Sequence, residues 1–522
     1  MGLTTTVGIA ASGLKVTQTA TALVSANIAG ASTDGYTKKS VSTQGIYAAT
    51  GLVGFTTTVT RAFDQEVFDQ LASSTATSSY LDTKSTYLDQ VDALLGSTET
   101  GAALPTALSS FSTDLQTLAA QPDSTAAQIQ VVNSATVLSQ TLNSLSSTVS
   151  DLSDAVSVSI SEGVDSVNRL TRQVSDLNAK IIQFRATGMD STGLEDQRDQ
   201  AILELSTYVD VQVKPQDDGS VRVSTGSGLT LVDNARATQL TVDGKGDLRV
   251  DDGHGTGAEL IASGMIGSGS LKALYEVRDT VLPQVQSQLD QVAAGLASAM
   301  SDTTSAGTAV TSGTQAGYSV DSGDLVSGNR MTLTYTDTVT GESKTVSLIA
   351  VNDPSALPLS DDATLDPNDT VVGIDFSGGS ASVASQIQAA LGSSFAVSNP
   401  SGSTIQILGA GTGAVTVDGL TKTVTATTTQ SGSAGVPLFT DAGTIYSGSL
   451  DQGAQIDGLA SRLRVNSAIT ADPSLLVAYS STTEVGDSTR PDALFAALSN
   501  GTVTTTLGNG SAPKTGTIAS FA

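Results

Sequence analysis

The longest helical pattern in the sequence runs from Ser124 to Ala186, a stretch with no proline and one glycine, Gly163. Apolar residues recur there at steps of three and four, and Gly163 occupies the position between Ile160 and Val167. The apolar residues are Leu138, Leu142, Leu145, Val149, Leu152, Val156, Ile160, Val167, Leu170, Val174, Leu177, Ile181 and Phe184. This spacing predicts one helix of about 60 residues, about 90 Å long at 1.5 Å per residue. Two successive steps of four, from Leu152 to Ile160, form a stutter that locally unwinds a left-handed supercoil. A helix of this length indicates a rod-like element.

Shorter helical and extended patterns surround this stretch. Helical spacing recurs at residues 64–95, 193–208 and 271–300. Alternating apolar residues between Gly-containing turns predict short strands, at 209–213, 221–223, 229–232, 240–242 and 248–250. The chain is therefore predicted to be an α+β multidomain protein. It should be elongated, with long heptad-patterned helices in a rod-like inner part and β-rich domains facing outward.

Residues 306–435 differ from the rest of the chain in being rich in Ser, Thr and Gly. Between residues 301 and 460 there are 15 acidic residues against Arg330, Lys344 and Lys422. Strands are predicted at 331–335, 345–351, 371–376, 404–408 and 414–417, and one helix at 382–391. We interpret this region as an inserted domain whose surface faces water.

These patterns divide the chain into seven predicted segments. The last of them, residues 499–522, shows no convincing periodicity. The segments are an N-terminal helix and loop (1–60), a long-helix rod domain (61–210), a β-rich segment (211–270), a returning helix of the rod domain (271–305), an acidic β-rich outer domain (306–435), a late segment (436–498) and an irregular tail (499–522).

The overall charge and composition exclude several classes of function. Lys and Arg number 24 and Asp and Glu number 51, a formal net charge of −27. Nucleic acids and anionic membranes both require a cationic footprint, so neither is an expected partner. There is no cysteine or tryptophan, and the single histidine is His254, expected in an exposed loop. Disulfides, thiolate sites and multi-histidine metal centres are thus excluded. We predict no catalytic, cofactor-binding or metal site, and a structural protein rather than an enzyme.

Two stretches resemble ligand sites only superficially. The run from Gly409 to Gly413 lacks the Lys-Ser/Thr ending of a phosphate loop and no helix follows it, so a β-turn is predicted. Four aspartates, Asp361, Asp362, Asp366 and Asp369, could in principle gather around Ca²⁺, but their spacing does not match an EF-hand. A solvated loop is the favoured interpretation.

The N-terminal segment differs from the rest in charge and pattern. Residues 1–60 carry three lysines and one aspartate, a net charge of +2, which leaves −29 for the remainder. A thin heptad occupies residues 3–28, namely Leu3, Val7, Ala10, Leu14, Thr17, Thr21, Val24 and Ile28. Such a helix is marginal alone in water and should need a partner helix, although an ordinary amphipathic surface helix is the alternative. Asp34-Gly35 then predicts a turn. The segment lacks the basic and apolar regions of a secretory signal, which leaves a cytoplasmic protein or export without cleavage.

Several motifs in this segment resemble a known signature. Ser12-Gly13-Leu14, Gln18, Ser25-Ala26-Asn27-Ile28-Ala29 and Thr33-Asp34-Gly35-Tyr36 are similar to the signature of bacterial flagellar rod, hook and hook-associated proteins. Later stretches narrow the resemblance to the FlgK family, the first hook-associated proteins. These are Leu194 to Asp199, Gly269 to Leu274, Arg462 to Asn466 and Asp472 to Leu475.

The sequence also departs from the family pattern. Gly30 replaces the usual last Asn of the N-terminal signature, which is expected to loosen the helix end, and Ser301 to Ser305 replaces an Asn-x-x-His-x-x-Gly stretch. The family's long C-terminal heptad helix has no counterpart in residues 499–522. We expect a truncated chain, and altered axial pairing is the alternative.

The resemblance implies an assembly function. Leu3, Val7, Leu14 and Ile28 would form the inner packing face of a helical array, and Asn27, Gly35 and Tyr36 the helix-to-loop turn. The implied partners are further copies of the chain, the hook protein, the next hook-associated protein and an export chaperone. The implied location is extracellular, at the hook–filament junction of the flagellum, after type III export without a cleaved signal peptide.

Other functions stay open at this point. The chain could be another flagellar axial protein, either the hook subunit or the third hook-associated protein. It could also be a secreted β-rich adhesin with a coiled-coil stalk. A metal-dependent enzyme is a further alternative without a positive signal in the sequence.

Overall fold

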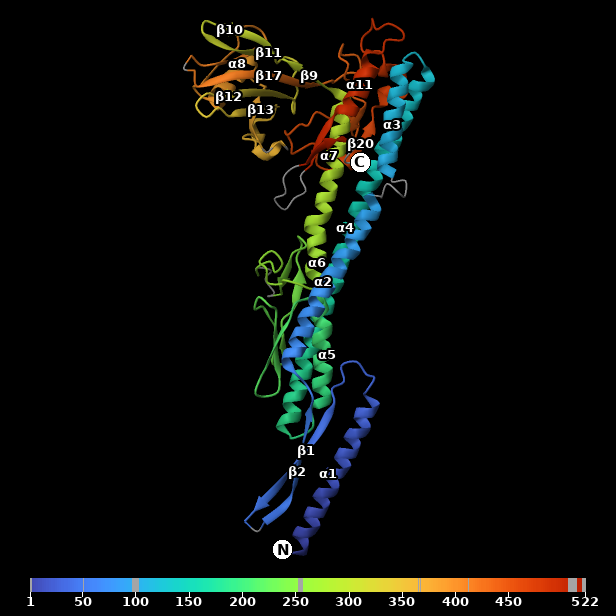
Figure 1. The fold of residues 1–522 in the computed structure, drawn as a ribbon, viewed down its shortest axis with the longest axis vertical. Helices are drawn as coiled ribbons and strands as arrows, with labels where there is room; N and C mark the ends of the chain where they lie inside the picture. The colour runs from blue at the N-terminus through green and yellow to red at the C-terminus, as the bar shows by residue number, and fades with distance from the viewer. Residues whose placement is uncertain are drawn as a thin grey trace. The chain divides into compact units, whose positions relative to one another are not determined.

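The computed structural model describes residues 2–49, 51–95, 103–251, 257–364, 366, 368–411, 413–505 and 514–518 (Figure 1). The chain divides into two compact units. The first comprises Met1–Gln90 and Leu152–Val281, and the second comprises Val91–Asp151 and Leu282–Ala522. His254 lies outside the described residues.

The predicted long helix is confirmed as α4, Thr125–Ala186, with 62 residues. Its seam is buried within the stutter at Val156 and Ile160, and on either side of it at Val149 and Val167. In the first unit α4 packs with α2 (Gln65–Leu95), α5 (Thr192–Tyr208) and α6 (Ser270–Glu276). Gly163 lies on the buried seam, where an added Cβ would be 2.8 Å from Leu271 Cδ2. The single glycine of the helix therefore allows close contact with α6.

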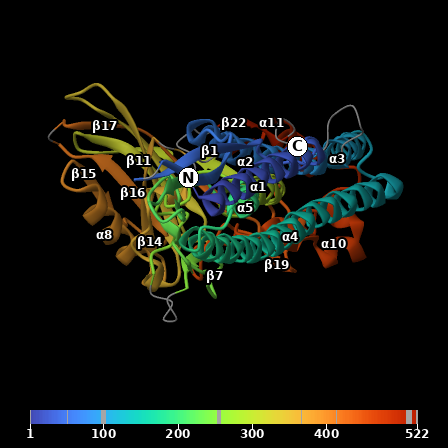
Figure 2. The same ribbon diagram turned by 90° about the horizontal axis from the view of Figure 1, so that it is seen from below.

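A β-hairpin follows the N-terminal helix α1 (Leu3–Ala29), where the sequence had predicted only a loop. Strands β1 (Lys39–Ala48) and β2 (Gly51–Arg61) pair antiparallel, with Lys39 opposite Arg61. Helix α1 runs alongside the hairpin, and Ser12 Oγ accepts a hydrogen bond of 3.2 Å from the Phe55 amide (Figures 1 and 2). The expectation of an N-terminal segment made of helix and loop is thus corrected to helix and hairpin.

Two small sheets complete the first unit. One contains β3 (Gln212–Pro215), β4 (Val221–Ser224), β5 (Thr230–Asp233) and β6 (Arg236–Ala237), and the other β7 (Leu240–Val242) and β8 (Leu248–Val250). The predicted strands at 221–223, 240–242 and 248–250 are confirmed, and the first strand starts three residues later than predicted. Two asparagines of α4 hold these sheets. The side-chain amide of Asn178 hydrogen-bonds the backbone N–H and C=O of Val221 in β4, and that of Asn168 hydrogen-bonds the same groups of Leu240 in β7.

In the second unit, α3 (Ala103–Ala120), α7 (Leu282–Ser301) and α11 (Thr489–Asn500) pack together. The predicted helix 271–300 is divided, because a π-helical turn at Val277–Val281 separates α6 from α7. Three short strands form one sheet, namely β18 (Phe439–Asp441), β19 (Thr444–Ile445) and β20 (Leu463–Val465). Short helices α9 (Leu459–Arg462) and α10 (Ser467–Ala471) flank β20. The tail predicted to be irregular contains a hairpin, β21 (Thr502–Thr505) with β22 (Lys514–Thr517).

The inserted region of this unit forms two sheets. The five-stranded sheet has the order β14-β13-β12-β17-β9, and the four-stranded sheet the order β10-β11-β16-β15. The strands are β9 (Asp302–Ala306), β10 (Thr308–Ser312), β11 (Gln315–Asp321), β12 (Arg330–Asp337), β13 (Ser343–Val351), β14 (Asp369–Asp375), β15 (Phe395–Ser398), β16 (Thr404–Gly409) and β17 (Val415–Thr425). With helix α8 (Ser380–Leu391) they enclose a core of their own that includes Met331, Leu333 and Ile387.

Candidate assembly surface

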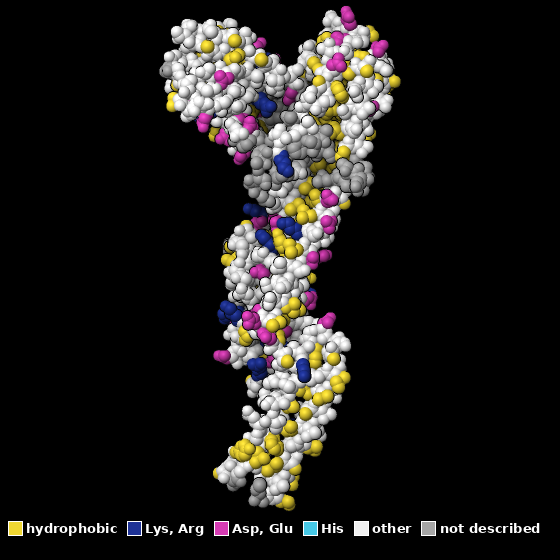
Figure 3. All heavy atoms as spheres, viewed as in Figure 1, with side chains coloured by type: hydrophobic (Ala, Val, Ile, Leu, Met, Phe, Trp, Pro, Cys, Tyr) yellow, Lys and Arg dark blue, Asp and Glu magenta, His cyan; other side chains and the backbone are white. Residues whose placement is uncertain are grey.

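The N-terminal helix exposes its apolar residues. The exposed fractions are 84% for Leu3, 61% for Val7, 62% for Leu14 and 73% for Ile28, and no residue of α1 is buried. The hairpin adds Ile46 and Tyr47, which are 48% and 76% exposed and which the sequence analysis missed. Figure 3 shows hydrophobic side chains gathered over α1 and the hairpin. Because a contiguous apolar surface is unfavourable in water, this one is typical of an interaction site.

The residues predicted at the helix-to-loop turn are brought together. Tyr36 Oη donates a hydrogen bond of 2.9 Å to Asn27 Oδ1. The same oxygen accepts the Lys39 amide at 2.9 Å, and Asn27 Nδ2 donates to the Lys39 carbonyl at 2.8 Å. One side chain thus satisfies both backbone groups at the start of β1. Gly35 has φ +75°, a conformation that glycine adopts without strain.

Gly30 has a definite place in this turn. Its N–H donates to the Ala26 carbonyl at 2.8 Å and closes the end of α1. A Cβ at this position would lie 2.6 Å from Tyr36 Cδ2, so any larger residue would displace the aromatic ring. In this chain Gly30 therefore leaves room for the Tyr36 ring.

A buried charge cluster joins the hairpin to α5. Arg61 forms ion pairs with Glu195 at 2.9 Å, Asp196 at 3.1 Å and Asp199 at 2.6 Å. Each acid has a second cation: Arg185 at 2.8 Å from Glu195, Lys39 at 2.8 Å from Asp196 and Arg198 at 3.3 Å from Asp199. Because Lys39 and Arg61 are opposite each other in the hairpin register, they present two cations together at the open end of the hairpin.

At the carboxyl groups of this cluster, burial disfavours ionisation and the paired cations favour it. Burial opposes ionisation of Glu195, but hydrogen bonds from Arg185 and Ser191 and the charge of Arg61 hold its pKa below the usual range. At Asp199 burial dominates and raises the pKa despite the neighbouring Arg198 and Arg61. The cluster is therefore stable only while all of its partners are present, which is typical of buried ion pairs.

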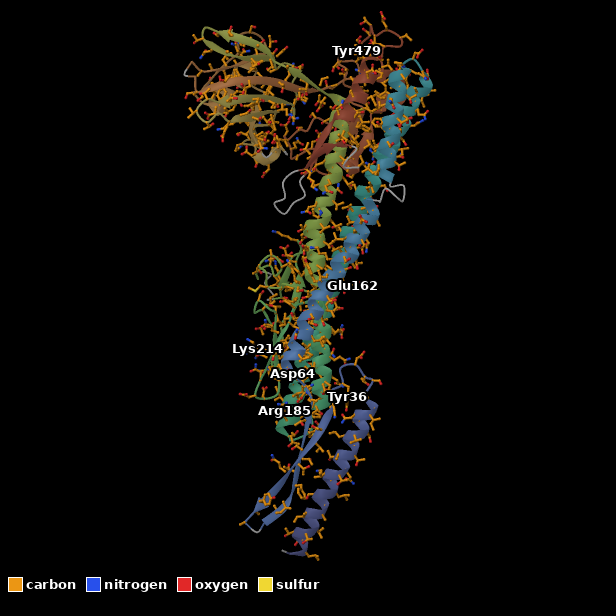
Figure 4. The ribbon with its side chains drawn as sticks, in the orientation of Figure 1. Tyr36, Asp64, Glu162, Arg185, Lys214 and Tyr479 are labelled. Atoms are coloured by element: carbon orange, nitrogen blue, oxygen red, sulfur yellow. The ribbon has the colours of Figure 1, made fainter. Side chains whose placement is uncertain are left out.

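Only half of this cluster was found from the sequence. Leu194 to Asp199 carry part of the family resemblance, but no physical partner was predicted for them. Lys39 and Arg61 are more than 130 residues away along the chain, and no local spacing connects them with α5. Figure 4 labels Tyr36 of the turn and Arg185 of the cluster.

No candidate metal site occurs in the part of the chain that the structure describes, where no three His, Asp or Glu residues gather suitably. Asp361 and Asp362 lie in a 3₁₀ turn, Asp361–Ala363, in which Ser360 caps the chain. Among the described helices, none combines the length and hydropathy needed to span a bilayer.

The fold and these surfaces define an α+β multidomain protein with long helices and an exposed apolar N-terminal helix. Residues 88–319 match the family described as "Flagellar hook-associated protein FlgK helical domain". The chain is 29% identical over 305 residues to flagellar hook-associated protein 1 of Salmonella typhimurium, which covers 56% of this chain and 54% of the relative. The corresponding protein of Escherichia coli is 28% identical over 312 residues, 57% of this chain and 56% of the relative. The Bacillus subtilis protein is 27% identical over 283 residues, which cover 50% of this chain and 55% of the relative.

The matched region thus spans about half the length of these curated relatives. A solved structure of the flagellar hook junction protein FlgK from Burkholderia pseudomallei aligns with 76% of this chain and 66% of its own, at 19% identity and a TM-score of 0.40. On these matches, residues 88–319 are similar to the helical domain of the FlgK family, and the chain is similar to flagellar hook-associated proteins over about half of its length.

Proposed function

We propose that this protein is a structural subunit of the bacterial flagellum that links the hook to the filament. The observation that carries the proposal is the exposed apolar face of α1, defined by Leu3, Val7, Leu14 and Ile28. Similarity to relatives that are named as flagellar hook-associated proteins supports this location. Burial of this face against partner helices would remove a cost that the isolated chain bears in water.

The turn and the charge cluster would position this face during assembly. Asn27 connects α1 to the start of β1, and Lys39 and Arg61 connect the same hairpin to α5. A helix held in this way can pair with neighbouring helices without separating from its own subunit. The neighbours we propose are copies of this chain, the hook protein and the next hook-associated protein, with an export chaperone bound before assembly.

The acidic outer domain would project into solvent and take no part in the inner contacts. Its two sheets enclose a separate apolar core, so the domain does not depend on the N-terminal helix for its stability. We propose a mechanical function without catalysis, at an extracellular position on the flagellum reached by type III export. The seven segments predicted from the sequence remain our proposal for the domain organisation.

Deletion of the gene tests this function. We expect electron microscopy to show bare hooks, and a blot of the medium to show unpolymerised flagellin. Normal filaments would contradict the proposal and favour the adhesin. Missing hooks would instead identify a rod or hook subunit.

A further inference from the structure

One exposed face of α4 in the first unit carries segregated charge. Its residues recur at steps of three and four and are all exposed, in the order Asp154, Val158, Glu162, Asp165, Arg169, Arg172, Asp176 and Lys180. The N-terminal half of the face holds three acids and no base, and the C-terminal half holds three bases and one acid. Val158 is 59% exposed in the acidic half, and Glu162 is labelled in Figure 4.

This arrangement is unfavourable for a helix that faces only water. Glu162 and Asp165 are three residues apart, as are Arg169 and Arg172, and like charges at this spacing repel each other. Asp165 with Arg169 and Asp176 with Lys180 are opposite charges four residues apart, a spacing that stabilises a helix. Asp154 and Glu162 have no Lys or Arg at such a spacing, so their charges are left for a contact outside α4.

The basic half borders a groove between α4 and α5. Its charged lining consists of the bases Arg169, Arg172 and Lys180 and the acids Asp176 and Glu204. Arg169 has an exposed ion pair with Glu204 at 3.1 Å, and Arg172 donates a hydrogen bond to Gln239. Lys180 has no ion-pair partner in the described part of the chain, and neither have the three acids of the other half. Asp176 also forms no ion pair in this part of the chain, so five charged groups of the face are available to a partner.

We propose that the acidic half of this face binds the basic half of the same face on a second copy of the chain. The offset follows from the sequence: 172 − 154 = 18 and 180 − 162 = 18, and 18 residues are about five helical turns. A parallel copy displaced along α4 by about 27 Å brings Asp154 opposite Arg172 and Glu162 opposite Lys180, with both pairs on one face. The occupant is a copy of this chain because the two halves are complementary to each other.

Such a contact is heterologous, so each copy presents a free acidic half at one end and a free basic half at the other. Contacts of this kind extend into open helical arrays. The parallel direction rests on the proposed function, since subunits of an axial array point the same way. An antiparallel pair would also match these charges, but it would close as a dimer.

Cysteine cross-linking distinguishes the two geometries, and the chain has no cysteine of its own. The variant V158C/D176C replaces two exposed residues that are also 18 apart, too far for a short bismaleimide to join within one chain. In flagella isolated from a strain that carries this variant, we expect a ladder of dimers, trimers and larger products. The single variants V158C and D176C should give none.

Charge reversal provides the second measurement. In the cysteine background, D154K/E162K should lower cross-linking to the level of the single-cysteine controls, and adding R172E/K180E should restore the ladder. Products that stop at the dimer would overturn the staggered contact. Absence of cross-links in flagella that retain the protein at the junction would overturn it as well, while leaving the proposed function standing. Absence of the protein from flagella would contradict the proposed function and this contact together.

Discussion

The substitution Arg61→Met should release the N-terminal hairpin from α5. It removes three ion pairs at once, to Glu195, Asp196 and Asp199, whose side chains are at most 10% exposed. Removal of one partner from a buried pair costs about 3–5 kcal/mol. Each acid keeps a second cation, so we expect the lower end of that range, about 3 kcal/mol. A free-energy change of about 1.36 kcal/mol changes an equilibrium constant tenfold. The loss therefore corresponds to a roughly 150-fold increase in the equilibrium constant for local opening of the hairpin.

Hydrogen exchange of the β1 and β2 amides measures this opening directly. The control is Arg222→Met, because the ion pair of Arg222 with Asp233 is nearly half exposed on both sides. That change should alter the local free energy by no more than about 0.5 kcal/mol. Exchange in the Arg61 variant within twofold of the parent protein would refute the reasoning about the cluster.

Three further substitutions test other contacts. Asn27→Ala removes three hydrogen bonds across the turn and should cost about 2 kcal/mol of hairpin stability, seen as faster exchange; unchanged protection of β1 would contradict this. Gly269→Ala places a Cβ 2.4 Å from the Tyr208 carbonyl oxygen at φ +96°, and should lower stability by at least about 2 kcal/mol in thermal unfolding. The control Gly313→Ala, at φ +62° with no neighbouring atom, should cost about 1 kcal/mol, and equal losses would refute the packing argument. Arg490→Met leaves five backbone carbonyls without their buried donor and should cost about 3 kcal/mol, and an unchanged melting temperature would exclude that role.

Elements in which the apolar repeat continues over many residues were predictable from the sequence. Helix α4 was expected at 124–186 and occurs at Thr125–Ala186, because a run without proline repeats its apolar seam for about thirteen turns. Among the outer-domain strands, β12, β13, β14, β16 and β17 were predicted from their apolar runs, whereas β9, β10, β11 and β15 were missed. Helix α3 was missed although its sequence carries the signal, since Leu104, Leu108, Phe111, Leu115 and Leu118 recur at steps of three and four and are all buried.

The candidate site was predictable only in its local part. Asn27, Gly35 and Tyr36 lie within one turn of chain, where Tyr36 bonds Asn27, and their role in assembly stays a prediction. The pairing of Arg61 with α5 was not predictable, because tertiary folding alone brings these charges together. Strand β2 was also missed, although Val53, Phe55 and Val59 alternate with other residues along it, because its many threonines and glycines resemble a loop.

Immunogold labelling of isolated flagella tests the central claim most directly. Antibodies against residues 306–435 should bind the outer domain without interfering with the inner contacts that we propose. The account predicts gold particles confined to the boundary between hook and filament. Particles distributed along the filament or the hook, or flagella without label although the protein is produced, would contradict it.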